Sequence, residues 1–328
     1  MKNKVVMIFT GGTIAMKVDP NLDAAIPGVG SNEIMNMVKD VERFTDIETI
    51  DFGNLPSPHM TPSIMLDLSK VVKENIDREE VTGIVITHGT DTLEETAYFL
   101  DLIANSEKPI IVVGSMRNNS ELGYDGAANI SAAIYTAVSP EAKNRGVLVV
   151  MNNEIHDARD VTKTNTSSVD TFKSLEYGPL GIVNNNRVIF HRNSMERQFL
   201  DADVIEKKVG LIKAASGMES DIIDFYIDNG YKGLVIEALG CGNLPPAMIS
   251  GVKRAISENI PLILVSRCPI GPVTATYGYE GGGSHLRDLG VIFGGIQSGQ
   301  KARIKLSIAL GITQDVEEIR KIFEDYLA

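Results

Sequence analysis

The stretch TGGTIA, at residues 10–15, carries Thr13 directly after two glycines and at the end of an apolar run. Glycine adopts turns that other residues resist, so this turn could present the Thr13 hydroxyl as a nucleophile. A phosphate-binding loop is the alternative reading of a Gly-rich turn at this place. However, the sequence contains neither G-x-G-x-x-G nor G-x-x-x-x-G-K-[ST] here, and Pro20 and Pro27 interrupt any helix that should follow.

A second stretch, THGTDT at residues 87–92, places Thr90 next to Asp91 after another apolar run. A hydroxyl beside a carboxylate can help to activate a nucleophile. The structural alternative is that Asp91 and Thr92 only cap a helix that begins there. Lys163, among the hydroxyls of DVTKTNTSS, could pass a proton if the fold brought it to this pair, and is otherwise a solvated surface lysine.

These residues need a scaffold, and the chain repeats short β-branched apolar runs at residues 5–9, 83–87, 109–114 and 146–151. Runs without polar alternation are typical of strands covered on both faces. Segments with helical spacing lie between them, such as 92–103 and 125–138. The alternation predicts an α/β fold with a doubly wound parallel sheet. Ligands bind at the carboxyl ends of strands in such sheets, where Thr13 and Thr90 are expected.

A polar stretch without clean periodicity, residues 191–208, separates this pattern from a second one. We expect residues 1–190 to form the large N-terminal catalytic α/β domain, 191–208 the linker and 209–328 a second, smaller α/β domain. A chain of 328 residues is long enough to bury two cores.

The composition excludes several classes of partner. The formal net charge is -12 and the basic residues are dispersed, so we expect no nucleic-acid partner and no membrane partner. Two cysteines and five scattered histidines lack the spacing of a zinc site, and no nucleotide motif is present, so we expect no metal and no cofactor. The start, MKNKVVMIF, does not resemble a signal peptide, and we expect a cytoplasmic protein.

Taken together, these motifs resemble those of the bacterial L-asparaginase/glutaminase family, whose nucleophile is a threonine. The paired signature is TGGTIA with ITHGTDTLEETAYFL, at residues 86–100. The likeness continues through GSMR, RGVLVVMN, RDVTKTNTSSVDTFKS, GPLG, GCGNLP and KARIKL. It covers almost the whole chain, and it favours the nucleophile reading of Thr13 over the phosphate reading.

The resemblance implies a chemistry for these residues. Thr13 would attack the side-chain amide of L-asparagine and release ammonia through an acyl-enzyme. Thr90, Asp91 and Lys163 would form a second catalytic cluster that activates a hydroxyl or water, beside backbone N–H groups that steady the oxyanion.

The resemblance also implies how the substrate is held. Asp91 would bind its α-ammonium and Ser57, in LPSPHM, its α-carboxylate, with Gly12 and Gly89 also lining the site. It implies a homotetramer built from intimate dimers, in which a neighbouring subunit completes each site. Glu280, in YGYEGGG, is the residue that we expect the neighbour to contribute.

Three departures from the family pattern stand out. Many members carry a tyrosine in the loop after the first motif, where its hydroxyl touches the nucleophile, and here Ala24 or Ala25 takes that place. A glutamine that binds the substrate amine commonly follows the serine, and here it is Pro58, with His59 adjacent. Cys241 replaces an asparagine found in some relatives, and we interpret it as a packing residue.

The leading hypothesis is a cytoplasmic L-asparaginase, with minor L-glutaminase activity left open. A catalytically weak amino-acid sensor on the same fold is the main alternative, favoured only by the missing tyrosine. The asparaginase-like subunit of an aminoacyl-tRNA amidotransferase fits less well, because that subunit carries an extra domain before the Gly-Gly-Thr strand. Preference between the two amides depends on about one methylene of pocket depth, which motifs do not reveal.

Overall fold

We describe the protein from a computed structural model that covers residues 3–19, 22, 24–28, 30–38, 41, 43–194 and 197–324. The chain divides into two compact units, Met1–Phe199 and Leu200–Ala328, and each is described by itself. The division falls inside the polar stretch 191–208, of which residues 195 and 196 lie outside the described part.

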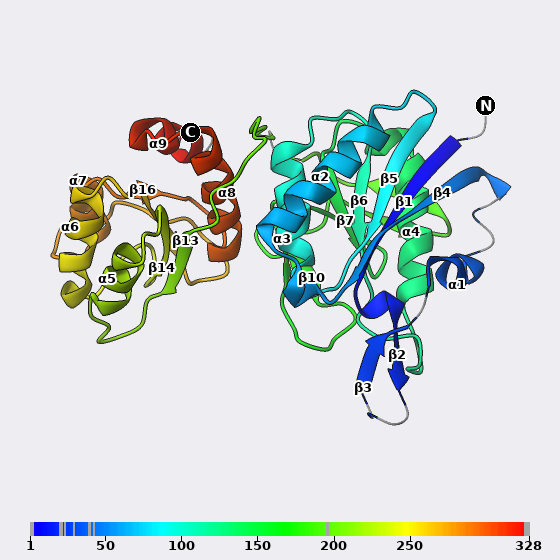
Figure 1. The fold of residues 1–328 in the computed structure, drawn as a ribbon, viewed down its shortest axis with the longest axis horizontal. Coiled ribbons are helices and arrows are strands. Elements are labelled where there is room, and N and C mark those ends of the chain that lie inside the picture. The colour runs from blue at the N-terminus through cyan, green and yellow to red at the C-terminus, as the bar shows by residue number, and fades with distance from the viewer. Residues whose placement is uncertain are drawn as a thin grey trace. The chain divides into compact units, whose positions relative to one another are not determined.

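Unit 1 contains an eight-stranded sheet with the order β12-β11-β8-β7-β6-β5-β1-β4 (Figure 1). Its strands are β1 (Asn3–Gly11), β4 (Thr45–Leu55), β5 (Val81–Thr87), β6 (Ile110–Val113), β7 (Val147–Met151), β8 (Glu154–Asp157), β11 (Gly181–Asn184) and β12 (Arg187–Phe190). Parallel pairing joins β4, β1, β5, β6 and β7, which confirms the expected parallel core.

The remaining strands of this sheet differ from a purely parallel expectation. β8 pairs antiparallel with β7, and β11 pairs antiparallel with both β8 and β12. The turns are Asn-Asn pairs: Asn152 and Asn153 join β7 to β8, and Asn185 and Asn186 join β11 to β12, all with positive φ. Asparagine tolerates this conformation, which matches the twist of two-residue hairpins.

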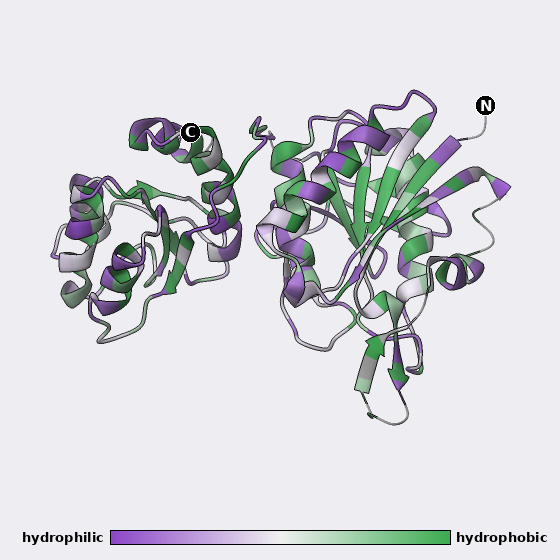
Figure 2. Cartoon of the chain, viewed as in Figure 1, coloured by the Kyte–Doolittle hydropathy of each residue, from purple (hydrophilic) through white to green (hydrophobic). Residues whose placement is uncertain are grey.

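Four helices of unit 1 are α1 (Ser31–Asn36), α2 (Pro62–Ile76), α3 (Leu93–Ile103) and α4 (Gly126–Val138). α2 and α3 pack against each other and against the sheet, and α4 packs against β1, β5, β6 and β7. Within β5 every residue except Thr82 is buried, so helices cover both faces of this strand. The central strands are accordingly hydrophobic along their length, whereas the helices alternate (Figure 2).

Two small sheets complete unit 1. β2 (Met16–Asp19) and β3 (Ala24–Pro27) form a hairpin directly after the first Gly-Gly-Thr turn, and β9 (Val161–Lys163) pairs antiparallel with β10 (Phe172–Ser174). These two pairs carry or flank the residues singled out above. The large sheet therefore provides the rigid scaffold and the small sheets bring further side chains to it.

Unit 2 is a four-stranded sheet with the order β13-β14-β15-β16, all parallel. Its elements are β13 (Val209–Lys213), α5 (Asp221–Asp228), β14 (Gly233–Ala238), α6 (Ile249–Ser257), β15 (Leu262–Ser266), α7 (Gly283–Asp288), β16 (Ile292–Phe293), α8 (Gly299–Ile312) and α9 (Val316–Glu324). Separate apolar clusters lie on its two faces, one with α5 and α6 and the other with α8 and α9. The expected second α/β unit is confirmed.

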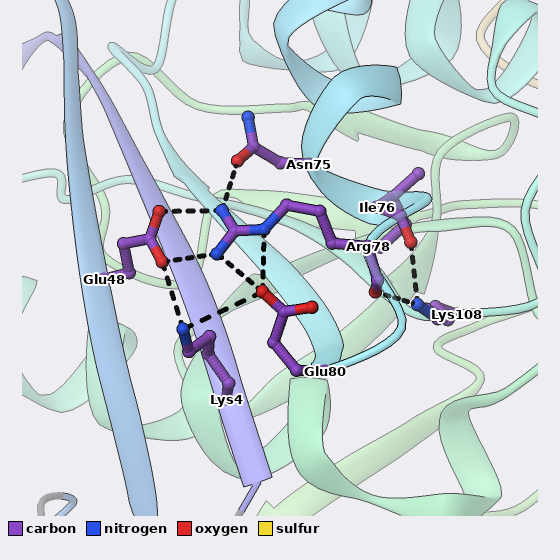
Figure 3. A network of polar contacts seen from close by, with 7 residues as sticks. All are labelled: Lys4, Glu48, Asn75, Ile76, Arg78, Glu80 and Lys108. Atoms are coloured by element: carbon purple, nitrogen blue, oxygen red, sulfur yellow. Dashed lines mark hydrogen bonds and ion pairs between the residues drawn. The ribbon is translucent and has the colours of Figure 1, made fainter.

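A polar network joins β1 and β4 to the segment between α2 and β5 (Figure 3). Arg78 donates two hydrogen bonds of 2.7 Å to the carboxylate of Glu48 and also bonds Glu80. Lys4 lies 3.4 Å from the same Glu48. Lys4 is the second residue of β1, whereas Thr13 follows the last one, so this network lies near the end of the strand opposite the Gly-Gly-Thr turn.

The strand order changes direction between β1 and β5. After β1 the chain adds β4 on one side, and then places β5, β6 and β7 on the other side. In open α/β sheets, ligands bind at the carboxyl ends of strands at such a switch. The two turns that follow β1 and β5 are therefore where the site is expected.

Candidate active site

The turns that follow β1 and β5 are packed directly against each other. Gly11 and Gly12 have φ values of 106° and 87°, a region that favours glycine. A β-carbon at Gly12 would overlap the Cα and N atoms of Gly89, and one at Gly11 would overlap the backbone of Leu55. Only a glycine at position 12 lets the first turn approach the second this closely, so the turn that leads into Thr13 packs against His88 and Gly89.

Thr13 itself begins a single turn of 3-10 helix, Thr13–Ala15, and is half-buried. The turn is closed by a 2.9 Å hydrogen bond from the Ala15 amide to the Gly12 carbonyl, and the chain then enters strand β2. No α-helix follows directly, so the turn lacks the row of amides that a phosphate-binding loop uses. This geometry does not form a phosphate cradle.

The second cluster is brought together by Lys163, at the end of β9. Its Nζ donates hydrogen bonds of 3.0 Å to Oγ1 of Thr90 and 2.8 Å to Oδ1 of Asp91. Thr90 is buried, and the Lys163 side chain is only 18% exposed, whereas the Asp91 side chain is 61% exposed. The ammonium is therefore sheltered and bound, while the carboxylate faces open solvent.

Ser57 also belongs to this cluster, although it lies on a different segment. Its Oγ accepts a 3.2 Å hydrogen bond from the Asp91 amide, and its carbonyl accepts a 2.8 Å bond from the Thr92 hydroxyl. A β-carbon at Gly89 would come within 2.8 Å of the Ser57 side chain. Ser57, Gly89 and Asp91 are thus in contact.

These contacts argue against a purely capping role for residues 91 and 92. Thr92 is the residue before α3, but its side chain makes no capping hydrogen bond and bonds Ser57 instead. Asp91 uses its carboxylate for Lys163. Both side chains turn toward neighbouring segments, as expected of a site and not of a helix cap.

Sequence reasoning missed two residues that hold this cluster. Glu94 is buried in the first turn of α3 and its Oε2 accepts a 2.6 Å hydrogen bond from the Lys163 amide. The sequence around Glu94 indicates only that it lies in a helix. Carboxylates are rarely buried without a partner, so the burial of Glu94 is explained by its bond to Lys163.

His88 is the other missed residue. Its Nδ1 lies 2.8 Å from the Gly89 carbonyl and its Nε2 lies 2.9 Å from Oγ1 of Thr96. The carbonyl can only accept, so the neutral tautomer carries its proton on Nδ1. Burial lowers the pKa of His88 to about 4, and the bond to the Gly89 carbonyl opposes this only partly. A neutral histidine therefore braces the turn that carries Thr90.

The departures from the family pattern fall in different places. Pro58 and His59 are exposed on the short 3-10 segment that begins at Ser57. Ala24 is an exposed residue at the start of β3, and the side chain of Ala25 lies outside the described part of the chain.

Two other residues of interest belong to unit 2 and are described with that unit alone. Glu280 is exposed on the loop before α7, next to Gly281, whose φ is 84°. Cys241 is half-buried, and its carbonyl accepts a 2.8 Å hydrogen bond from the Thr274 amide. Neither is placed relative to Thr13.

Metal sites and membrane spans are not found in the part of the chain that the structure describes. Within the described ranges, no group of three or more His, Cys, Asp or Glu side chains could hold a metal ion. Across those ranges no helix is both long and apolar enough to cross a bilayer.

Family models match both units. The model described as "Asparaginase, N-terminal" matches residues 4–196, and the model described as "Glutaminase/Asparaginase C-terminal domain" matches residues 208–323. Together they account for most of the chain.

Individual relatives agree with these models. L-asparaginase 2 of Escherichia coli is 35% identical over 98% of this chain and 93% of its own length. A glutamyl-tRNA(Gln) amidotransferase subunit of Methanobrevibacter smithii is 30% identical over 100% of this chain and 76% of its own length. A solved structure of a probable cytoplasmic L-asparaginase from Campylobacter jejuni is 31% identical, with a TM-score of 0.88 over 98% of this chain and 99% of that one.

Proposed function

The chain belongs to the asparaginase family of enzymes, and we propose that it hydrolyses L-asparagine to L-aspartate and ammonia. The observation that carries this proposal is the contact between the Thr13 turn and the turn of Thr90 and Asp91, to which Lys163 of β9 is hydrogen-bonded. An amide hydrolase with a hydroxyl nucleophile also needs a group that accepts and donates protons. Thr13 would supply the nucleophile, and the cluster of Thr90, Asp91 and Lys163 would supply the proton-transfer group.

In the proposed first step, the Thr13 oxygen attacks the side-chain amide carbon of asparagine. The C–O bond forms, the C–N bond breaks, and the hydroxyl proton passes to the leaving nitrogen, which departs as ammonia. In the second step, water attacks the resulting ester, releases aspartate and returns a proton to Thr13. Lys163 hydrogen-bonds Thr90 at 3.0 Å, which supports a role for this pair in holding and relaying those protons.

Recognition of the zwitterionic substrate follows from the same cluster. The exposed carboxylate of Asp91 offers a partner for the α-ammonium. Ser57 already accepts a hydrogen bond from the Asp91 amide, so its own proton is left to donate to the α-carboxylate. Backbone amides near Gly12 and Gly89 would lie beside the reacting group.

We also propose that the active form is a homotetramer whose sites are completed by Glu280 of a neighbouring copy. The exposure of Asp91 supports this, because a hydrolase site that excludes water needs a cover over such a carboxylate. Mixing Thr13→Ala with Glu280→Ala would test it: activity regained from two inactive variants supports shared sites, whereas no regain after subunit exchange contradicts them.

We further propose a cytoplasmic location. Both cysteines are free, which suits a reducing compartment, and the Campylobacter relative is described as cytoplasmic. The Haemophilus influenzae relative, 34% identical, is described as periplasmic, so fractionation of the native cells is the appropriate test.

The decisive experiment measures ammonia released from L-asparagine and L-glutamine by wild type and Thr13→Ala. Turnover of asparagine that disappears in Thr13→Ala supports the threonine acyl-enzyme, and slower turnover of glutamine would be a minor side activity. Turnover of neither amide, together with a higher melting temperature in the presence of asparagine, would instead identify an amino-acid sensor.

A further inference from the structure

The segment after Thr13 is held by a loop that follows β6, residues 115–125. Three hydrogen bonds of 3.1 Å join them: the Tyr124 hydroxyl donates to the Ile14 carbonyl, the Asn119 amide to the Met16 carbonyl, and the Val18 amide to Ser120 Oγ. The contacts fall on every second residue after Thr13, so the loop supports the hairpin strand along its length. The Tyr124 bond is the one nearest the nucleophile.

The loop is itself closed by internal hydrogen bonds. The Asp125 carboxylate accepts from the amides of Met116 and Arg117, at 3.1 and 3.0 Å. The Arg117 guanidinium bonds the carbonyls of Leu122 and Gly123 at 3.2 and 3.1 Å. These bonds hold the start of the loop to its end, so Tyr124 projects from a braced segment and its hydroxyl has a defined position.

The Tyr124 ring lies over the first residue of α4. A β-carbon at Gly126 would overlap the hydroxyl end of this ring, and the three nearest atoms all belong to it. Burial raises the pKa of Tyr124 to about 12, and the nearby Asp125 carboxylate acts in the same direction. The phenol therefore remains protonated and acts as a hydrogen-bond donor, not as a base.

We propose that Tyr124 is a positioning residue for Thr13, acting through the Ile14 carbonyl. This inference rests on the proposed function. The resemblance places a tyrosine in the hairpin loop, where this chain has Ala24 and Ala25, and Tyr124 brings a phenol to the same turn from a different element. Its bond holds the 3-10 turn at the carbonyl that directly follows Thr13, so the nucleophile keeps its orientation toward the amide carbon.

The first test compares Tyr124→Phe with wild type. The substitution removes one hydroxyl and keeps the ring, and we expect kcat for asparagine to fall about 10- to 100-fold. KM should change less than about twofold, because the Tyr124 hydroxyl bonds the Ile14 carbonyl and, among the described residues, makes no hydrogen bond to Ser57 or Asp91. Tyr135→Phe is the matched control, since its ring stacks on Phe44 in the same unit, and kcat should not change.

A second variant keeps the Tyr124 hydroxyl but moves it out of place. Gly126→Ala retains Tyr124 but places a methyl group where the ring now lies, so the ring must move away from Ile14. We expect kcat to fall as in Tyr124→Phe. An unchanged kcat in folded Tyr124→Phe overturns the inference.

A binding measurement in the Thr13→Ala background distinguishes a role of Tyr124 in positioning the nucleophile from a role in binding the substrate. Adding Tyr124→Phe there should leave the Kd for asparagine unchanged, because the tyrosine acts on the nucleophile. Weakening of more than about fivefold would instead assign Tyr124 to substrate binding and overturn the inference. Wild type that fails to turn over asparagine refutes the proposed function, whereas active wild type with an equally active Tyr124→Phe refutes only the role of Tyr124.

Discussion

The Nζ atom of Lys163 lies 3.0 Å from Oγ1 of Thr90, although 73 residues separate them in the chain. The same ammonium lies 2.8 Å from Asp91, so one lysine ties together both polar residues of the second turn. Thr90 is buried and Asp91 is exposed, which gives the lysine one sheltered and one solvated partner. The function proposed above assigns proton transfer to the sheltered side of this lysine and substrate binding to the exposed one.

Replacing Lys163 by methionine should remove most activity with little effect on folding. A positioned acid or base contributes about 10²- to 10⁴-fold to a rate, so we expect kcat to fall by at least about 100-fold. The Asp91 side chain is exposed, so water can hydrate its carboxylate when the Lys163 ammonium is removed, and the melting temperature should change little. Lys173→Met is the control, because Lys173 lies on the adjacent strand and pairs with Glu154 at 3.0 Å. Equal losses in the two variants would contradict a specific role.

Ser57→Ala should weaken substrate binding more than catalysis. A hydrogen bond to a charged group is worth about 1.5–3 kcal/mol, so we expect KM for asparagine to rise about tenfold or more with kcat within about threefold. Steady-state kinetics on Ser57→Ala and on Ser69→Ala, a helix serine that bonds the Leu66 carbonyl, would measure this. A fall in kcat at constant KM would assign Ser57 to the chemical step.

Glu94 should act by holding the backbone of Lys163 and not by its charge. Its Oε2 accepts from the Lys163 amide at 2.6 Å, and a glutamine oxygen can accept the same bond. We therefore expect Glu94→Gln to keep most of kcat and Glu94→Ala to lose about 10- to 100-fold. If glutamine proves as harmful as alanine, the negative charge itself is required.

His88 makes stability depend on pH in a defined direction. Burial lowers its pKa to about 4, so between about pH 6.5 and 4 the unfolded chain binds a proton that the folded chain does not. The free energy of unfolding is therefore not reduced by His88 above that window. It falls as the pH drops through the window, by about 3 kcal/mol in all.

His88→Gln can keep both hydrogen bonds but does not titrate, so the stability advantage of wild type over His88→Gln should shrink toward acid. Urea unfolding of both proteins at about pH 7.5 and about pH 4.5 measures the difference. A gap between the two proteins that stays constant with pH would show that His88 is not neutralised by burial.

The network around Arg78 should affect stability but not catalysis. The Arg78 guanidinium and Lys4 hold the pKa of Glu48 at about 2, against the smaller opposing effect of burial. The contribution of Glu48 is therefore present above its ordinary pKa and is lost as the pH falls from about 4.5 toward 2. Arg78→Met should lower the melting temperature slightly at neutral pH and leave kcat unchanged; a lower kcat would mean that this edge of the sheet is coupled to the site.

Much of the scaffold could be predicted because its elements have local signals. The apolar run at 83–87 lies within β5 (Val81–Thr87), and the helical pattern at 125–138 matches α4 (Gly126–Val138). The antiparallel strands were not anticipated, since their Asn-Asn turns are weaker signals than Asn-Gly. The roles of His88 and Glu94 are not predictable from the sequence for another reason: nothing in their immediate neighbours reveals which buried groups they bond.

The sequence by itself determined which side chains could do chemistry and which turns would carry them, because residue type and apolar patterning are local properties. Tertiary structure alone decided their partners. Because β1 and β5 pair in parallel, their carboxyl ends lie side by side at the same end of the sheet, where Gly12 contacts Gly89. Likewise, the Tyr124 hydroxyl meets the Ile14 carbonyl across 110 residues. Hydrogen bonds depend on distance in space, which the order of residues does not contain.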